Sequence, residues 1–413
     1  MARTRLTDKI NRLKGHMGDS SPPMSKPKIP TRYLDFAKVL GGKLITSNAG
    51  NYCLIRTVLP IGYRHGSHEL TIAGINSPLP LAAFDLSCNS ETIDFGSIIF
   101  IDTETTGLGG AGAVAFLIGV GRIIDEGFEL LQFIIPDYSD ETAMLEDLNS
   151  VFSDELTVVT FNGKSFDLPL LNDRLIINRV GRKLSLKHHL DLLHSSRRLF
   201  KRRLHSCTLM NLERELFAFH RTDDIPGYLV PSVFFDWLTC EDLSMMNAVV
   251  EHNRLDIISL FFLARLIAKA YSTTGGSLEF SEDLHSLSKW YDRRKEREKI
   301  EVVYNQAEML SGDMSAEAVL FYARCFKRLR KFDESIELLS KVSSNDSKHG
   351  FSANIELAVY YEHRTKDLHR ALEHATQAGR CKEISSSQKL NLRKRVGRLK
   401  QKLKKSKLTA GKF

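Results

Sequence analysis

The sequence predicts an α/β protein in which a mixed β-sheet is flanked by helices, with a β-rich segment before it and helices after it. Three apolar runs, at 98–101, 113–124 and 128–135, follow one another along the chain and predict a meander of strands. Helical and strand patterns then alternate as far as residue 270, which indicates crossover connections over a sheet. Together these observations place one sheet at the centre of the chain.

The sheet is expected to begin with the strand Ile98 to Ile101. Four large apolar residues in a row indicate a strand that is buried on both faces. The elements expected after the meander are a helix over 141–152, a strand over 157–161, a helix over 168–179, a short strand ending at Asp191 and a helix over 247–270. Three antiparallel strands followed by such crossovers form the ribonuclease H-like architecture, so we assign residues 96–270 to a domain of this kind.

Two segments precede this domain. Residues 1–30 are basic and contain Ser and Pro, and both a short amphipathic helix followed by a linker and a frayed tail are compatible with them. Residues 31–95 are β-rich, because two strand patterns flank a turn-forming stretch at 47–51, as in a hairpin. We expect residues 31–95 to form an N-terminal appendage that shields one edge of the sheet.

The remaining part of the chain is predicted to be helical. A linker, 271–300, contains a charged helix from Trp290 to Lys299, and the region 301–380 then repeats a pair of helices after about 35 residues, a spacing that resembles tetratricopeptide repeats. The expected pairs are 316–329 with 334–339 and 355–362 with 368–378. Two units are fewer than such an array normally needs to stand alone, and we expect this region to contact the substrate or a protein partner. The basic tail, 381–413, is either a solvated helix or an anchor for phosphate backbones.

Composition and charge narrow the class of protein. A chain of 413 residues is too long for one ordinary core, and no apolar run approaches the length that spans a bilayer, so no membrane contact is expected. The N-terminus lacks the apolar core of a secretion signal, and the six cysteines are scattered without a Cys-x-x-Cys pair. We therefore expect a cytoplasmic protein without a zinc ribbon or a disulfide framework. The formal net charge of +8 indicates a polyanionic partner.

Two carboxylates, Asp102 and Glu104, come directly after the apolar residues of the first central strand. On an extended strand the i, i+2 spacing points both side chains to the same side. Such carboxylates repel each other and are costly to bury while ionised, unless a hard divalent cation with oxygen ligands binds between them. For this pair alone a solvated acidic strand end is the simpler interpretation, so carboxylates elsewhere in the chain must decide.

Two further elements carry titratable groups in suitable positions. Asp167 follows a strand and a polar turn and lies at a helix start, where an N-cap is the ordinary alternative. His252 and Asp256 lie one turn apart on the same face of the helix expected over 247–270. Asp256 lies among apolar residues and needs a partner, for which a metal ion is suitable. For His252 the alternative is a partly buried structural histidine.

In this order, Asp-x-Glu, Asp and His-x-x-x-Asp resemble the DEDD exonuclease superfamily, also called DnaQ-like. The stretches 102–108 and 161–167 match its first two motifs. The stretches at 189–193, 206–209, 224–227 and 251–253 make the chain similar to the YprB-type ribonuclease H-like exonuclease domain. This resemblance covers about residues 96–270. It implies a 3′–5′ exonuclease that hydrolyses phosphodiester bonds of nucleic acid with two Mg²⁺ or Mn²⁺ ions.

The resemblance also implies which residues act. The metal ligands would be Asp102, Glu104, Asp167 and Asp256, and His252 would be the general base. One departure from the family pattern concerns His252. Members with a catalytic His usually place four residues between it and the last Asp, whereas this chain has three, the spacing of members with Tyr. Asp191 is expected to be a structural carboxylate at a strand end rather than a fifth ligand.

Nucleic acid with a single-stranded end is the expected substrate. The residues expected to contact it are Thr105, Leu108, Asn162, Arg197, Arg198, Arg202 and Arg203. Leu108 resembles the apolar wedge on which such enzymes stack the terminal base, with a simple loop contact as the alternative. The arginines either track a single strand or form a solvated helix face.

Two other functions remain compatible with the sequence. One is a nucleic-acid-binding or scaffold protein with a weak or idle nuclease core, and the other is an endonuclease built on the same fold. No base-reading module is recognisable, so the sequence does not select between DNA and RNA.

Overall fold

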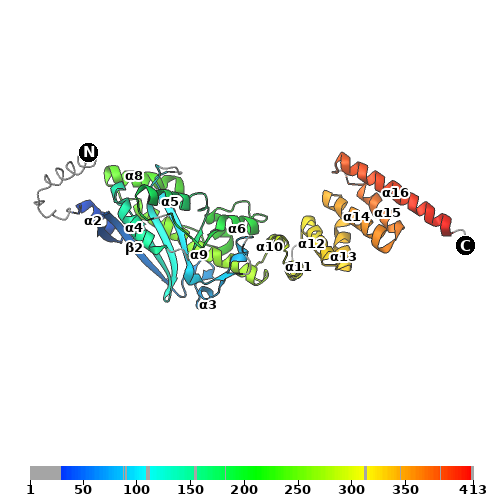
Figure 1. Cartoon of the computed structure of the whole chain (residues 1–413), viewed down its shortest axis with the longest axis horizontal. Coiled ribbons are helices and arrows are strands. Elements are labelled where there is room, and N and C mark those ends of the chain that lie inside the picture. The colour runs from blue at the N-terminus through cyan, green and yellow to red at the C-terminus, as the bar shows by residue number, and fades with distance from the viewer. Residues whose placement is uncertain are drawn as a thin grey trace, which may run out of the picture.

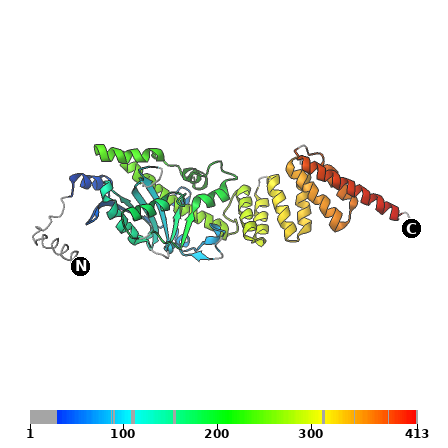
Figure 2. The same ribbon diagram turned by 45° about the horizontal axis from the view of Figure 1, so that its top comes forward.

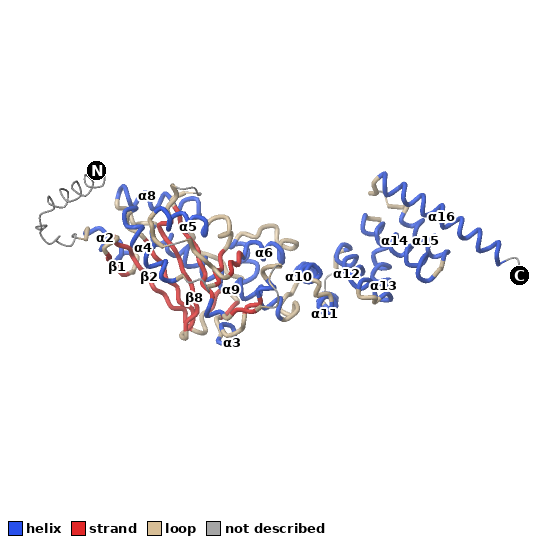
Figure 3. Tube along the Cα trace, viewed as in Figure 1, coloured by secondary structure: helices blue, strands red, loops and turns tan. Residues whose placement is uncertain are grey.

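The computed structural model describes residues 29–86, 88, 91–107, 112–152, 156–181, 183–310, 314–344, 346–381 and 383–410. The molecule is elongated, with a body built around a sheet and a row of helices that leads away from it (Figure 1). Coloured by secondary structure, the strands lie in the body and the C-terminal part is helical (Figure 3). The alternatives for the chain before residue 29, and Leu108, lie outside the described residues.

A seven-stranded mixed sheet forms the centre of the body, which confirms the predicted fold class. In sheet order its strands are β1 (Lys43–Ser47), β2 (Gly50–Pro60), β9 (Gly127–Ile134), β8 (Ala115–Ile124), β7 (Ile98–Thr105), β10 (Thr157–Thr160) and β11 (His188–Asp191). The strands β7, β8 and β9 form the expected antiparallel meander, and β10 and β11 run parallel to β7. The central strand β7 is therefore flanked on both sides, and residues 98–101 are 0–4% exposed.

The β-rich segment before the central domain contributes directly to this sheet. The hairpin of β1 and β2 forms around residues 48–49, and β2 pairs with β9 along eight residues, from Cys53 to Pro60. The appendage thus continues the sheet at the β9 edge. A helix, α2 (Thr31–Val39), precedes the hairpin. Short elements follow the hairpin: β3 (Arg64–His65), β4 (His68–Glu69), α3 (Ile72–Ile75), β5 (Leu79–Pro80), η1 (Leu81–Ala83), β6 (Thr92–Ile93) and η2 (Phe95–Ser97).

Helices cover both faces of the sheet because β7 alternates its apolar side chains between them. Ile98 and Phe100 belong to one core with α9, and Ile99 and Ile101 belong to another with α4, α5 and α8. The helices of the body are η3 (Tyr138–Asp140), α4 (Glu141–Val151), α5 (Asp167–Ile177), α6 (Leu192–Phe200), α7 (Leu209–Phe217), η4 (Gly227–Leu229), α8 (Val230–Cys240) and α9 (Met246–Ser272). The long helix α9 crosses β7 and β8 and so lies close to the two strand-end carboxylates.

The C-terminal helices pack side by side in a row (Figure 2). They are α10 (Ser281–Arg294), α11 (Glu298–Met309), α12 (Ala316–Arg328), α13 (Phe332–Ser343), α14 (Lys348–Tyr360), η5 (Tyr361–Thr365), α15 (Leu368–Ala378) and α16 (Ser386–Ala410). The pairs α12 with α13 and α14 with α15 lie where helix pairs were expected. Among the described residues, no helix is both long and apolar enough to cross a membrane.

The prediction of one charged helix from Trp290 to Lys299 is wrong. Lys295 adopts a left-handed conformation with φ of 63°, which ends α10, and α11 begins three residues later. Nor is α10 a loose linker. Its residues Leu284 and Leu287 are buried in the same core as α9, so the helical row is packed onto the body.

Candidate active site

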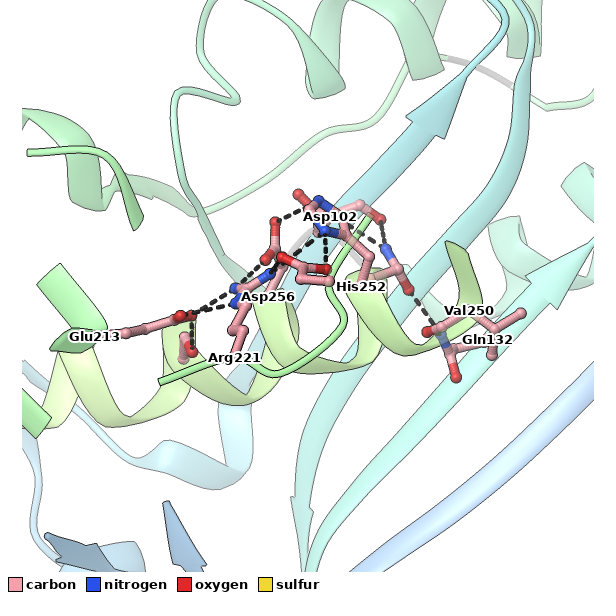
Figure 4. Close-up of polar contacts among 10 residues, drawn as sticks. Asp102, Gln132, Glu213, Arg221, Val250, His252 and Asp256 are labelled. Atoms are coloured by element: carbon pink, nitrogen blue, oxygen red, sulfur yellow. Dashed lines mark hydrogen bonds and ion pairs between the residues drawn. The ribbon is translucent and has the colours of Figure 1, made fainter. Parts of the chain in front are cut away.

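The strand β7 presents Asp102 and Glu104 toward α9, as the i, i+2 spacing predicted. Asp102 lies opposite Gly119 of β8, and Gly119 lies opposite Gln132 of β9. Asn253 of α9 fills the space over Gly119, where an added Cβ would lie 2.3 Å from the Asn253 side-chain oxygen. The Nδ2 atom of Asn253 donates to Oδ2 of Asp102 at 2.9 Å, and Gln132 donates to Oδ1 of Asn253 at 3.0 Å (Figure 4). A buried amide relay therefore fixes the first carboxylate.

Asp167 reaches the same region from the other side of β7. It is the first residue of α5, and its Oδ1 accepts a hydrogen bond of 2.6 Å from the hydroxyl of Thr103. Phe166 occupies the N-cap position, so the alternative of Asp167 as the N-cap is wrong. The residue between the two strand carboxylates thus holds the third one.

The helix α9 supplies His252 and Asp256 on one face, one turn apart. Asp224, from the loop between α7 and α8, accepts a hydrogen bond from Nδ1 of His252 at 2.7 Å. The Nε2 atom of His252 consequently faces Asp256, whose Oδ2 is 3.9 Å away. The short spacing between His252 and Asp256 is therefore compatible with an imidazole turned toward the carboxylates.

Burial, together with the crowding of like charges, makes the carboxylates difficult to ionise. Burial, together with the charges of Asp256 and Glu104, raises the pKa of Asp102 well above its usual range. Burial likewise raises the pKa of Glu104 to about 7 and that of Asp167 to about 6. Burial lowers the pKa of His252, but the negative charges of Asp256 and Glu104 outweigh it, and the net shift is upward. Asp102, Glu104, Asp167 and Asp256 thus share one strongly negative field.

Among the described residues, Arg221 forms ion pairs with carboxylates of this field, and no sequence pattern indicated it. Its side chain is 3% exposed and forms ion pairs with Glu213 at 2.5 Å, with Asp224 at 3.1 Å and with Asp256 (Figure 4). Glu213 also accepts a hydrogen bond from Ser259, and the Ser259 hydroxyl lies 2.9 Å from Nε2 of a buried histidine, His65. A polar chain therefore runs from the N-terminal segment to the carboxylates.

Comparison with known proteins identifies the domain. Residues 99–268 match the RNase_H superfamily. The chain is 31% identical over 363 residues to the uncharacterized protein YprB of Bacillus subtilis (strain 168), an alignment that covers 85% of this chain and 86% of YprB. The chain belongs to the YprB family. It is also similar, at 17% identity and a TM-score of 0.32, to the family B DNA polymerase of the archaeon Pyrobaculum calidifontis, over 48% of this chain and 29% of the polymerase.

In this YprB-family chain the donor set suits a hard divalent cation, because it consists of carboxylates beside one imidazole. As the side chains stand, the described residues contain no group of three or more His, Cys, Asp or Glu close enough to hold a metal ion. A guanidinium group and an amide group already occupy oxygens of two of the proposed ligands. Arg221 takes one oxygen of Asp256, and Asn253 takes one oxygen of Asp102. Ion binding would require these oxygens to exchange partners.

Two of the predicted substrate contacts, Thr105 and Asn162, belong to the motifs that carry the carboxylates. Both form hydrogen bonds within the protein. The Thr105 hydroxyl donates to the carbonyl of Gly107 at 2.7 Å. Asn162 has a φ of 67°, and its backbone N–H donates to Asp191 at 2.8 Å. Asp191 also accepts from the backbone N–H groups of Lys164 and Leu193. As the sequence analysis predicted, Asp191 is a structural carboxylate at a strand end, and it holds the second motif in place.

The predicted arginine surface on and after α6 needs correction. Arg198 stacks on Trp290, with Cζ 3.4 Å from the ring centroid, and donates to the carbonyls of Ala83 and Phe84. Arg203 binds the buried Asp283, and the exposed Arg202 binds Glu317. These three guanidinium groups join α6 to the C-terminal helices instead of lying free on a solvated face. Arg197 is exposed and keeps the predicted orientation toward solvent.

Proposed function

We propose that this chain is a DEDD-type 3′–5′ exonuclease that hydrolyses nucleic acid from a single-stranded end with divalent metal ions. One observation carries the proposal. Separate elements (β7, α5 and α9) bring Asp102, Glu104, Asp167 and Asp256 into one field, in which burial raises the pKa of Asp102, Glu104 and Asp167 and repulsion by neighbouring carboxylates adds to the shift. A protein that only needed a stable core would gain nothing from that repulsion, whereas bound cations would offset it.

The proposed division of labour follows from the contacts. Asp102, Glu104, Asp167 and Asp256 would hold Mg²⁺ or Mn²⁺, which when bound would neutralise charge on the scissile phosphate. His252 donates its Nδ1 proton to Asp224, so its Nε2 lone pair is free to take a proton from the attacking water. As the water oxygen bonds to phosphorus, the bond to the 3′ oxygen breaks, and that oxygen leaves as the hydroxyl of the shortened strand.

Asp224 would thus be a positioning residue. It orients His252 by one oxygen and binds Arg221 by the other, which ties the base to the same network as Asp256. The C-terminal helices would form a tetratricopeptide-like module for contact with the substrate or a protein partner, in a cytoplasmic protein.

A second candidate function rests on a different observation. Arg221 and Asn253 occupy oxygens of two proposed ligands, as expected if the nuclease core were idle and the chain bound nucleic acid as a scaffold. The two functions differ in whether bound nucleic acid is shortened.

The deciding experiment incubates the purified chain with 5′-labelled single-stranded DNA or RNA in Mg²⁺ or Mn²⁺, beside the Asp102→Asn variant. The expected result is a ladder of progressively shortened products, reduced about 1000-fold or more in the variant. Internal cuts without a ladder would indicate an endonuclease. Binding of either substrate without any shortening, in all four combinations of strand and metal, would refute the nuclease and favour the scaffold.

A further inference from the structure

A basic hollow lies between α6 of the body and α10, the first helix of the C-terminal row. These helices pack against each other, and the hollow beside them has a volume of about 570 Å³. Its charged lining residues are Arg197, Arg198, Lys201, Arg202, Lys289 and Arg293. None of the described lining residues is a carboxylate, so six positive charges from two separate regions of the sequence face one space.

The charges in this hollow are only partly compensated. Within the described part of the chain, neither Arg197 nor Arg293 has a carboxylate within ion-pair distance, and both are exposed. Burial, together with the charge of Arg293, lowers the pKa of Arg198 to about 10. Like charges that crowd in this way indicate a place where an anion would bind favourably.

Two further hollows continue the first along the helical row. The second, of about 610 Å³, shares Lys289 with the first and is also lined by Arg324, Arg328 and Lys348. The third, of about 450 Å³, shares Gln388 with the second and is lined by three cations of α16: Lys394, Arg395 and Arg398. We call the three hollows together the basic groove. It extends from α6 to the last helix of the molecule.

Acidic residues reduce the positive charge of the groove without cancelling it. Its lining contains twelve Lys and Arg residues and two acids, Asp292 and Glu317. Asp292 pairs with Arg328, and Glu317 pairs with Arg202. Glu317 also lies within ion-pair distance of Lys289. Outside the lining, Glu356 pairs with Arg324, and Glu362 pairs with Arg395 and Arg398. Most of the remaining cations, among them the exposed Lys348 and Lys394, face an open and elongated surface.

We propose that the basic groove binds the sugar-phosphate backbone of a nucleic-acid strand, so that the C-terminal helices hold the part of the substrate that lies outside the reacting centre. The inference rests on the proposed function for its choice of nucleic acid among polyanions. The groove would read charge rather than base sequence, because its indole, Trp290, is 5% exposed and already covered by Arg198. His285, which is 2% exposed and whose Nε2 lacks a hydrogen-bond partner among the described residues, also lines it.

The test measures binding of labelled single-stranded DNA, single-stranded RNA and duplex by fluorescence anisotropy, over a range of salt concentrations. All proteins are full-length and carry Asp102→Asn, and the buffer contains EDTA, so that no strand is degraded. The test variant is Arg197→Gln with Arg293→Gln. Its matched control is Lys38→Gln with Arg380→Gln, which also removes two exposed positive charges but at positions outside the groove. Melting temperatures of both variants confirm that they fold.

For the groove variant we expect roughly tenfold weaker binding of a single strand and a salt dependence less steep by about 1.4, the loss of two phosphate contacts. The control pair should bind as the parent does. A second variant, Lys348→Gln with Lys394→Gln, should weaken binding of a long strand more than that of a short one. Equal binding by the groove variant and the control pair, or equally effective competition by polyglutamate, would overturn the proposal.

Failure of this inference can be told apart from failure of the proposed function. If the protein with Asp102 intact shortens strands in Mn²⁺, and Arg197→Gln with Arg293→Gln made in that same background does so equally well at low substrate concentration, the groove proposal fails and the nuclease stands. If no strand is shortened but the groove variant binds more weakly than the control, the groove stands and the nuclease fails.

Discussion

The two sides of the carboxylate centre handle buried charge in opposite ways. On the α9 side, Arg221 compensates Glu213, Asp224 and Asp256, so the negative charges there are paired and hydrogen-bonded. On the β7 side, Asp102 and Glu104 face each other's charge, and the contact to Asp102 that the structure shows is an amide. The paired side therefore stabilises the fold, whereas the unpaired side costs stability that a bound cation would restore.

The largest expected effect breaks the paired side. Replacing Arg221 with Met removes the partner of Glu213, which is fully buried, and leaves its charge uncompensated. We expect the free energy of unfolding to fall by about 3–5 kcal/mol, measured by urea denaturation at pH 7.5. The double variant Glu213→Gln with Arg221→Met should recover part of that loss, because the fully buried charge of Glu213 is then removed while Asp224 and Asp256 still lack their cation. A loss below about 1 kcal/mol in the single variant would show that Arg221 does not hold the network together.

On the unpaired side we expect a substitution to increase the free energy of unfolding instead of lowering it. Glu104 has its pKa raised to about 7 in the folded chain, from an ordinary value of 4.5. The folded state therefore binds the Glu104 proton more tightly than the unfolded state does. The stability that this proton contributes is complete below pH 4.5 and is lost as the pH rises through about 7. In EDTA at pH 8, Glu104→Gln should thus stabilise the protein, by up to about 3 kcal/mol, and should have little effect at pH 4.5.

This prediction is checked by urea unfolding at both pH values, with Glu69→Gln as the control because Glu69 is exposed. Adding Mn²⁺ at pH 8 should raise the melting temperature of the native protein and not that of Glu104→Gln, since the cation replaces the missing proton. If Glu104→Gln destabilises the protein at pH 8 in EDTA, then the carboxylate is already compensated and the two sides do not differ.

The sequence indicated which carboxylates and which histidine lie together, but not the arginine that pairs with them. The apolar run before Asp102 and the one-turn spacing of His252 and Asp256 are periodic patterns, and periodicity predicts which side chains share a face. Arg221 follows Ala218, whose φ is 50°, in an irregular loop between α7 and α8, where no period applies. Glu213 and Asp224 lie within eight residues of Arg221, but Asp256 is 35 residues away, so only the folded structure brings the three partners together.

The same reasoning explains what the sequence predicted of the fold. Local hairpins and apolar runs predicted the meander of β7, β8 and β9. The pairing of β2 with β9 joins residues more than sixty positions apart, and nothing in either strand specifies its partner. The break between α10 and α11 falls at Lys295, without the Gly or Pro that commonly marks a helix end.

The smallest expected effect concerns the amide relay that joins the two sides. An alanine at Gly119 would place its Cβ 2.3 Å from Oδ1 of Asn253, which would push the amide away from Asp102. We expect Gly119→Ala to cost about 1–3 kcal/mol of stability, as overpacking usually does. The control is Gly96→Ala, because an added Cβ at Gly96 meets nothing within 4 Å. Nuclease activity should fall in Gly119→Ala by a larger factor than stability alone explains, because Asp102 loses its orienting donor. Full activity with the expected loss of stability would mean that Asn253 supports the fold but does not position the carboxylate.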